Sequence, residues 1–332
     1  MSSSRAGAPR YIENTRRCKI KIGDLGEFGV INRITGRLTQ GPDVLLGPGD
    51  DAAVLAAPDG RVVVTTDLLV EGRHFRRDWS SGYDIGRKAA AQNLADVAAM
   101  GARPTALVVG LGIPADTPVA WLDALTDGMR DECAQVGASV AGGDIVRADL
   151  VVLGVTALGD LGGRPPVTRS GARPGQLVAV TGRLGYAAAG LALLQAGRAA
   201  EEFAELVAAH RRPCPPYRRG PEAAELGATA MLDVSDGLVQ DLGHVAAASG
   251  VGVELDPEAL PVPEVMRAAA AALGADPLDW VLGGGEDHAL AAVFPAGTAL
   301  PDEWRVIGRV VEGGGVRVAG RVAGRAGWDH FR

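Results

Sequence analysis

Aromatic residues are scarce in this chain, basic residues are not in excess, and no apolar run is long. Aromatic side chains make up 4% of the 332 residues, so any sizeable core must be built from Ala, Val and Leu. The formal net charge is -7 without a basic stripe, which argues against a nucleic-acid partner. No apolar stretch is long enough to span a bilayer, so we expect no membrane partner either.

Cysteine is rare as well. Cys18, Cys133 and Cys214 are the three cysteines, and no two of them have C-x-x-C spacing, so neither a zinc site nor a disulfide framework is indicated. The first ten residues are rich in Ser and Arg but lack the apolar core of a signal peptide. We therefore expect a cytoplasmic protein whose residues 1–22 form a disordered extension.

Strand patterns alternate with helical patterns, which indicates an α/β or α+β fold class. A stretch rich in Gly, Pro and Arg, residues 159–175, is the best linker candidate, so we expect one domain over residues 23–160 and a second over 161–332. A buried strand is predicted over 62–66, ending at Asp67. The main helices are expected at 25–34, with Phe28, Ile31 and Ile34 on its apolar face, and at 83–100, 118–136, 186–197, 201–210, 236–250 and 263–273.

Acidic residues follow several of the predicted strands. Any one of them is readily explained as a turn residue or helix cap, because Asp is favoured there. Together they indicate more, since buried carboxylates repel one another unless a cation neutralises them, and Mg²⁺ prefers such oxygen ligands. The residues in question are Asp50, Asp51, Asp67, Asp144, Asp233 and Asp236.

A further carboxylate lies inside an Ala-rich helical segment. Gln92 and Lys88 precede Asp96 by four and eight residues, and Asn93 precedes it by three. That spacing places the polar groups on one helix face, which is either a solvated stripe or part of a site.

The glycine motifs exclude familiar nucleotide sites. GLGIPA at 110–115 resembles a dinucleotide fingerprint, but Pro114 lies in the turn and the next helix starts late. Neither a P-loop nor the protein-kinase motif set is present. The GGD (142–144) and GGGED (283–287) motifs instead suggest tight turns that bring backbone N–H groups near a ligand.

Two local patterns leave alternatives open. In LDVSDGL, Asp233 ends a strand, Ser235 is a candidate N-cap and Asp236 lies in the first helical turn, as in a plain capped helix or an anion or metal site. His74 lies shortly after Asp67, and it is as readily structural as functional.

Eight motifs together resemble the thiamine-monophosphate kinase family. They occur in the family's order and cover about residues 25–332: GDDAAVL, TTDLLVEGRHF, NLADVAAMGA, AGGDIVR, TRSGARPG, LDVSDGL, GGGEDHAL and GWDHF. The resemblance implies a two-domain fold shared with aminoimidazole ribonucleotide synthetase, with the N-terminal domains paired in a homodimer. It also implies the last step of thiamine diphosphate biosynthesis, in which ATP phosphorylates thiamine monophosphate.

The same resemblance implies roles for individual residues. Several Mg²⁺ ions would be bound by Asp51, Thr65, Thr66, Asp67, Asp96, Asp144, Asp233 and Asp236. ATP, the co-substrate, would contact Gly143, Asp144, Arg169 and Ser235. Thiamine monophosphate would contact His74, Glu286 and Trp328.

Elementary chemistry agrees with these roles. Phosphoryl transfer needs positioning and charge neutralisation, which Mg²⁺ ions and the donor fork of Arg169 could supply. Glu286 could attract the cationic thiazolium ring, and Trp328 could stack on it. No Cys, His or Ser lies in an activated-nucleophile arrangement, so we expect direct in-line transfer of the γ-phosphoryl group with no covalent catalytic residue.

Two alternatives stay open. Another ATP-dependent enzyme of the superfamily is one, although Cys18 lacks the context of a selenophosphate synthetase and the chain ends in DHFR, not in the Cys of the hydrogenase-maturation relatives. A non-catalytic Mg-nucleotide-binding regulator is the other. Such a regulator would be expected to have lost some acidic positions, and all of them are present here.

Overall fold

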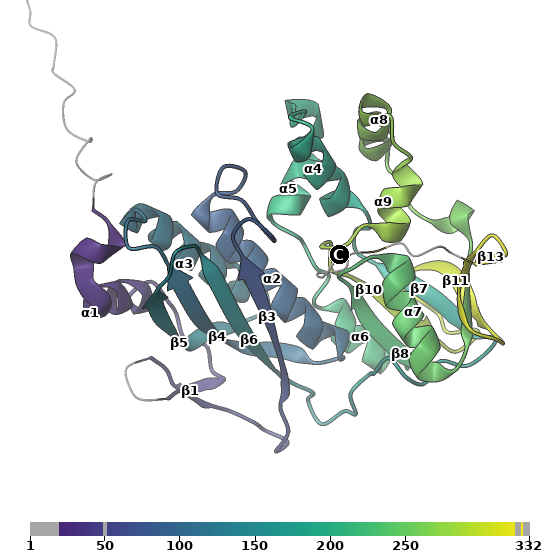
Figure 1. Cartoon of the computed structure of the whole chain (residues 1–332). Helices are drawn as coiled ribbons and strands as arrows, with labels where there is room; N and C mark the ends of the chain where they lie inside the picture. Colours follow the sequence, from purple (N-terminus) through teal and green to yellow (C-terminus); the bar gives the residue numbers. More distant parts are fainter. Residues whose placement is uncertain (1–19, 49–51, 323–326, 328–332) are drawn as a thin grey trace, which may run out of the picture.

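The computed structural model describes residues 20–48, 52–322 and 327, which form two α/β parts lying side by side (Figure 1). A four-stranded sheet organises the first part and a seven-stranded sheet the second. Most of the expected N-terminal extension lies outside the described residues, and helix α1 already begins at Ile22. Within the described ranges, no helix is long and apolar enough to cross a membrane.

The first sheet has the strand order β3-β6-β4-β5. Strands β4 and β5 run parallel, whereas the other two neighbouring pairs are antiparallel. A two-stranded ribbon, β1 with β2, lies beside β5. The bounds are β1 Val44–Leu46, β2 Val54–Leu55, β3 Val63–Val70, β4 Arg103–Ile113, β5 Ser139–Arg147 and β6 Val152–Asp160.

Two helices, α2 (Gly82–Ala99) and α3 (Val119–Ala134), lie in segments predicted to be helical, and they pack together and cover one face of this sheet (Figure 1). Helix α2 begins with a capping box, in which Ser81 accepts from the Asp84 N–H and the Asp84 carboxylate accepts from the Ser81 N–H. Its interior is rich in Ala, the strongest helix former, and its small side chains allow close packing.

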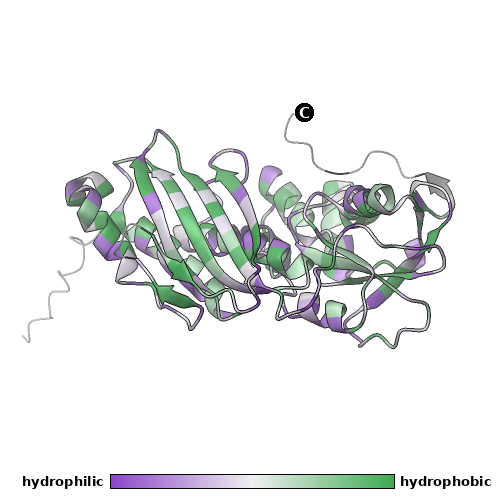
Figure 2. Ribbon diagram, turned by 90° about the horizontal axis from the view of Figure 1, so that it is seen from below, coloured by the Kyte–Doolittle hydropathy of each residue, from purple (hydrophilic) through white to green (hydrophobic). Residues whose placement is uncertain are grey.

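Strand β3 differs from its prediction. It does not end at Asp67 but continues to Val70, and alternate residues face opposite sides. Leu69 is fully buried on the helix side, whereas Val64 and Leu68 are 61% and 63% exposed on the other face. Figure 2 shows this outer face of the sheet in front, with apolar residues along its strands.

Two other local predictions were also wrong. Residues 142–144, expected to form a tight turn, lie inside strand β5. Helix α1 (Ile22–Thr35) spans the predicted segment, but Phe28 is 76% exposed, because a kink at Gly26 (φ +67°) leaves Ile22 and Val30 as the buried residues.

The second sheet has the order β13-β12-β9-β11-β7-β10-β8. Most of its helices pack on one face around a large aliphatic core, whereas α6 covers the other face near Phe294 and Trp304. The strands are β7 Leu177–Thr181, β8 Ala230–Val234, β9 Gly252–Leu255, β10 Ala289–Phe294, β11 Arg305–Val311, β12 Gly315–Val318 and β13 Arg321–Val322. The helices are α4 Tyr186–Gln195, α5 Ala204–Arg211, α6 Arg219–Glu225, α7 Leu238–Ser249, α8 Glu264–Leu273 and α9 Pro277–Gly283, with 3-10 turns at Glu201–Phe203 and Pro257–Ala259.

Helix α2 forms much of the contact between the two parts. A Cβ atom at Gly220 would lie 2.0 Å from the Ala98 carbonyl oxygen, so only glycine allows α6 to approach the end of α2 this closely. Tyr217 from the second half is buried in the core of the first, where its hydroxyl donates to Glu132 Oε1 at 2.6 Å. Helix α2 therefore lies between the two parts of the chain, and its side chains can contact both of them.

Candidate active site

Three polar side chains repeat every four residues along helix α2 and reach three partners. Gln92 Nε2 donates to Asp67 Oδ2 at 3.1 Å, and Asp96 Oδ2 accepts from Thr65 Oγ1 at 2.8 Å. Lys88 continues the row toward the second part of the chain. The predicted polar face is thus confirmed for Lys88, Gln92 and Asp96 as a partly buried contact surface, whereas Asn93 donates to the Ala89 carbonyl of its own helix.

Asp67 and Asp96 lie close to a third carboxylate, Asp233, which strand β8 supplies from the second sheet. The pKa of Asp96 is raised to about 7, first by burial and then by the negative charges of Asp233 and Asp67. The Thr65 hydrogen bond and the nearby His288 act in the opposite direction but do not offset this. Three elements that are distant in sequence therefore place acidic groups at one junction.

Two more carboxylates follow strand β8: Asp236 in the loop before α7 and Asp241 in α7 itself. Asp241, in the first turn of α7, accepts from the backbone N–H groups of Asp236 and Gly237 at 3.0 Å each. The pKa of Asp241 is raised to about 7, mainly by burial and also by Asp233 and Asp236. Ser235 is not the N-cap that the sequence suggested, because the N-cap of α7 is Gly237, two residues later.

His288 is a neighbour of this acidic group that the sequence analysis did not assign. Its Nδ1 lies 3.0 Å from Asp233 Oδ2, and both side chains are 7% exposed. Burial lowers the pKa of His288, but the hydrogen bond and the charge of Asp233 raise it by more. The imidazole thus partly balances the carboxylates.

The GGGED segment forms the tight turn that its glycines predicted. The Glu286 N–H donates to the Ser235 carbonyl at 2.8 Å, and a Cβ atom at Gly285 would lie 2.1 Å from that same oxygen. Glycine is therefore required for this turn to pack on the loop before α7. Glu286 itself has a φ of +69°, an uncommon conformation for a residue with a side chain.

Glu286 faces the first part of the chain. Its Oε1 lies 2.9 Å from Lys88 Nζ, and its Oε2 lies 3.4 Å from His210 Nδ1. Burial opposes ionisation, but the charge of Lys88 and the nearby imidazole of His210 outweigh it and hold the pKa of Glu286 well below its usual range. His74 lies at the same junction, where its Nδ1 accepts from the Val70 N–H at 3.0 Å and its carbonyl accepts from Lys88 at 3.2 Å.

Several predicted residues are not brought into this group. Thr66 lies on the outer face of β3, opposite Thr65, and its hydroxyl donates to the Val155 carbonyl. Arg169 is exposed in the loop between β6 and β7, and within the described ranges it makes no ion pair. Asp51 and Trp328 lie outside the described residues.

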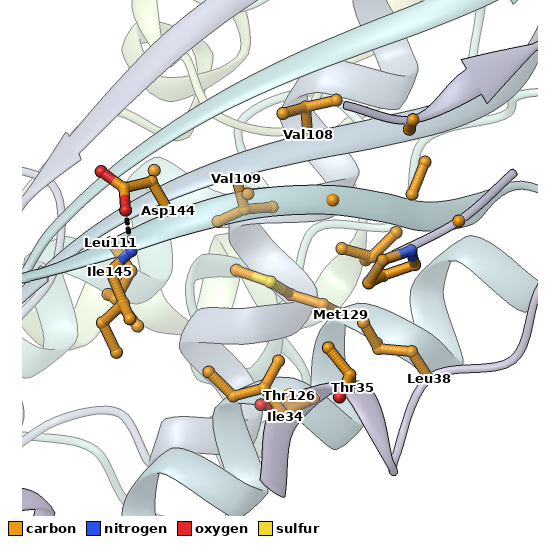
Figure 3. Close-up of a pocket in the computed structure, with 18 of the residues that line it drawn as sticks. Ile34, Thr35, Leu38, Val108, Val109, Leu111, Thr126, Met129, Asp144 and Ile145 are labelled. Atoms are coloured by element: carbon orange, nitrogen blue, oxygen red, sulfur yellow. Dashed lines mark hydrogen bonds between the residues drawn. The ribbon is translucent and has the colours of Figure 1, made fainter. Parts of the chain in front are cut away.

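Gly143 and Asp144 instead line a cavity of about 870 Å³ at the β5 edge of the first sheet. Helices α1 and α3 and the segment around the β1–β2 ribbon close it, and its walls are largely apolar, with Leu38 and Met129 among them (Figure 3). The Asp144 carboxylate accepts from the N–H of Ile145 at 2.9 Å (Figure 3). This cavity has the size and apolar character of a small-molecule pocket.

No metal-binding group of three or more His, Cys, Asp or Glu side chains is already assembled within the described part of the chain. Mg²⁺ commonly takes only one or two protein carboxylates and completes its shell with water and phosphate oxygens. The junction fits that pattern, because Asp67, Asp96 and Asp233 come close enough to repel one another. The repulsion is a reason for a cation to bind there.

The comparisons with known proteins agree with this arrangement. Residues 49–161 match the family described as AIR synthase related protein, N-terminal domain, and residues 173–321 match AIR synthase related protein, C-terminal domain. The chain is 54% identical to a thiamine-monophosphate kinase of Mycobacterium tuberculosis, over 93% of both chains. A thiamine-monophosphate kinase structure from Stenotrophomonas maltophilia is 37% identical, with a TM-score of 0.80, covering 90% of this chain and 98% of that one.

A structure of AaThiL complexed with AMPPCP and TMP is 32% identical, has a TM-score of 0.78, and covers 94% of this chain and 99% of its own. The fold and the acidic junction thus define a two-domain α/β protein of the AIR synthase-related class. Within that class, the chain belongs to the thiamine-monophosphate kinase family.

Proposed function

We propose that this protein is a thiamine-phosphate kinase, which transfers the γ-phosphoryl group of ATP to thiamine monophosphate and releases thiamine diphosphate and ADP. The observation that carries the proposal is the junction at which Asp67, Asp96 and Asp233 meet beside Glu286 and His74. Its similarity to AaThiL, a structure that contains AMPPCP and TMP, supports the same reaction. Thiamine diphosphate formation is the last step of that biosynthetic route.

Magnesium is part of the proposal. Asp67, Asp96, Asp233 and Asp236 would hold Mg²⁺ together with the Thr65 hydroxyl, and bound Mg²⁺ would offset the repulsion between the two phosphate-bearing substrates. Asp51, Thr66 and Asp144 are proposed as ligands of additional Mg²⁺ ions. Thr66 and Asp144 face away from the junction in this conformation, so they would belong to a different metal position.

ATP would extend between the cavity and the junction. The apolar walls of the cavity suit an adenine ring, and Gly143 and Asp144, which line the cavity, are the proposed contacts for the nucleotide. Arg169, with its exposed guanidinium, and Ser235, in the loop before α7, are the proposed contacts for the phosphates.

Thiamine monophosphate would bind against the second part of the chain. Glu286 is held as a carboxylate, which attracts the positive thiazolium ring, and His74 lies across from it at the junction. Trp328 is proposed to stack on the thiamine ring.

Transfer is proposed to be direct and in line. The acceptor is a phosphate oxygen that is already anionic, so no general base is required. Among the described cysteines, Cys133 is buried with its pKa raised to about 12, mainly by burial, which makes it a poor nucleophile. Inversion of configuration at a chiral γ-thiophosphate is the expected stereochemical result, and retention would contradict it.

A homodimer formed through the outer face of the first sheet belongs to this proposal. Its apolar residues, Val64, Leu68 and Val146 among them, are more than half exposed. A cytoplasmic location, where ATP and Mg²⁺ are available, is also proposed.

One experiment tests the reaction. The purified protein is incubated with ATP, Mg²⁺ and thiamine monophosphate, and thiamine diphosphate is measured by chromatography. Formation of thiamine diphosphate with equimolar ADP is expected. A protein that binds ATP and Mg²⁺ without turnover would instead be the non-catalytic regulator, and ATP consumption only with another substrate would indicate another enzyme of the superfamily.

A further inference from the structure

The ammonium group of Lys88 is a buried charge. It has no role among the proposed Mg²⁺ ligands or ATP contacts. The side chain is 3% exposed, and lysine is rarely buried so fully unless its charge is paired. Its Nζ lies 2.9 Å from Glu286 Oε1, 3.2 Å from the His74 carbonyl and 3.3 Å from the His210 carbonyl. These three contacts use the three N–H donors of the ammonium group.

The partners of Lys88 come from both halves of the chain. His74 follows strand β3 of the first sheet, whereas His210 ends α5 and Glu286 lies in the turn before β10. His74 and Glu286 are also the two described residues for which we propose contact with thiamine monophosphate. A single buried lysine therefore connects both of them.

We propose that Lys88 is a positioning residue, which fixes the Glu286 carboxylate against the His74 segment and so sets the affinity for the cationic thiamine ring without touching the substrate. This inference rests on the proposed function. It assigns a role in substrate binding to a residue that the motifs did not single out.

Charge and geometry both support a positioning role. The Glu286 side chain is about a third exposed, so it can be reached from outside the protein while Oε1 is held by Lys88. The backbone at Glu286 is in the left-handed region, an unfavourable conformation that surrounding contacts must hold in place. Without the ammonium group, burial would favour the protonated form of Glu286, and the turn would lose its contact with the first part of the chain.

The test is Lys88→Met, which keeps the unbranched apolar stem of the side chain, is one atom shorter, and removes the charge and the N–H donors. Binding of thiamine monophosphate is measured by calorimetry with Mg²⁺ and AMPPCP present, and KM values are measured for both substrates. We expect roughly tenfold weaker binding of thiamine monophosphate and a nearly unchanged KM for ATP. Lys21→Met, at an exposed lysine, is the matched control and should behave as wild type.

The pH dependence distinguishes positioning from simple loss of packing. In wild type, Glu286 stays ionised, so the affinity should vary little apart from titration of the substrate phosphate. In Lys88→Met, the defect should grow as the pH is lowered from about 8 to about 6, because Glu286 then takes up a proton more readily. Glu286→Gln, which cannot titrate there, should show no such growth.

A double-mutant cycle completes the test, and its comparison of Lys88→Met/Glu286→Gln with Glu286→Gln can be made even if Lys88→Met folds poorly, because the double variant leaves neither member of the ion pair without its partner. We expect the double variant to bind thiamine monophosphate as Glu286→Gln does. The inference would be overturned if Lys88→Met weakened thiamine monophosphate binding equally in wild type and in Glu286→Gln. It would also be overturned if Lys88→Met raised the KM for ATP as much as the KM for thiamine monophosphate. If wild type binds thiamine monophosphate but forms no thiamine diphosphate, the proposed function is wrong, and the double-mutant cycle still decides the role of Lys88. If wild type does not bind thiamine monophosphate, the proposed function and the role of Lys88 are both wrong.

Discussion

Thr65 Oγ1 donates a 2.8 Å hydrogen bond to Asp96 Oδ2, and this contact joins strand β3 to helix α2. Four residues earlier on the helix, Gln92 holds Asp67 in the same way. Neutral donors thus fix the orientation of two carboxylates without cancelling their charge. That arrangement leaves the negative charge available to a cation, and it makes the proposed metal dependence testable.

Asp67→Asn should remove most of the kinase activity even at saturating Mg²⁺, because it takes one charge from the junction while keeping the size of the side chain. A loss of about 2 kcal/mol in transition-state stabilisation corresponds to roughly a thirty-fold drop in kcat/KM. The assay is thiamine diphosphate formation as a function of Mg²⁺ concentration. Asp116→Asn, at an exposed aspartate, serves as the control, and a wild-type rate for Asp67→Asn would rule out the metal role.

The stability of the metal-free protein should fall as the pH rises. Asp96, Asp241 and Asp287 have pKa values raised to about 7, each mainly by burial. A carboxyl with a raised pKa stabilises the fold fully below its usual pKa of about 4, and that contribution is lost as the pH rises through its folded value. We expect Tm, measured with a chelator present, to decrease between about pH 5 and about pH 8.

Asp96→Asn should flatten part of this decrease and raise Tm at the upper end of the range, because the amide cannot ionise next to Asp67 and Asp233. The same substitution should lower the kinase activity. Asp116→Asn is again the control and should keep the wild-type slope. A decrease in Tm that is as steep in Asp96→Asn as in wild type would show that the carboxylate repulsion is not its cause.

The contact between Tyr217 and Glu132 should contribute measurably to the stability of the whole chain. Glu132 is 1% exposed and is paired with Arg87, and burial raises the pKa of Tyr217 well above its usual value, so the phenol remains a donor. Tyr217→Phe leaves Glu132 Oε1 without that donor, at a cost of about 1–3 kcal/mol in the free energy of unfolding. Urea denaturation measures the change.

Tyr83→Phe provides a matched control for this contact. The Tyr83 hydroxyl donates to Asp131, whose side chain is 39% exposed, and accepts from Arg87, whose side chain is 18% exposed, so water can replace the lost bonds. We expect a cost of about 0.5 kcal/mol, at the low end for a hydrogen bond. Equal costs for the two substitutions would mean that the burial of Glu132 does not increase the contribution of its hydrogen bond to the free energy of unfolding.

The sequence predicted much of this site because its signals are local. The four-residue spacing of Lys88, Gln92 and Asp96 defines a helix face, and the glycines of GGGED define a turn, without knowledge of the tertiary fold. The same local reading could not distinguish Thr65 from Thr66. Only pairing with β6 and packing on α2 decide which of the two faces the helix.

Other residues depended on contacts between distant segments. Lys88 reads as an ordinary helical lysine until the turn at Glu286 is folded against it. His288 and Asp241 are likewise meaningful only beside Asp233, which comes from another element in each case. Ser235 was misassigned as an N-cap because the side chain of Asp241 and the backbone of Gly237 take over the start of α7.

Leu68→Asp should convert the proposed dimer into a monomer. Leu68 is 63% exposed on the outer face of the first sheet, where a partner would bury it, and a buried unpaired carboxylate is strongly unfavourable. Light scattering coupled to gel filtration should therefore report the mass of two chains for wild type and of one for the variant, and Tm should fall because the folded state loses the stabilisation that association provides. Val306→Asp, at a valine that is 41% exposed on β11 of the other sheet, should leave the dimer intact. A monomeric wild type, or a Leu68→Asp variant that keeps the mass of two chains, would exclude this face as the interface.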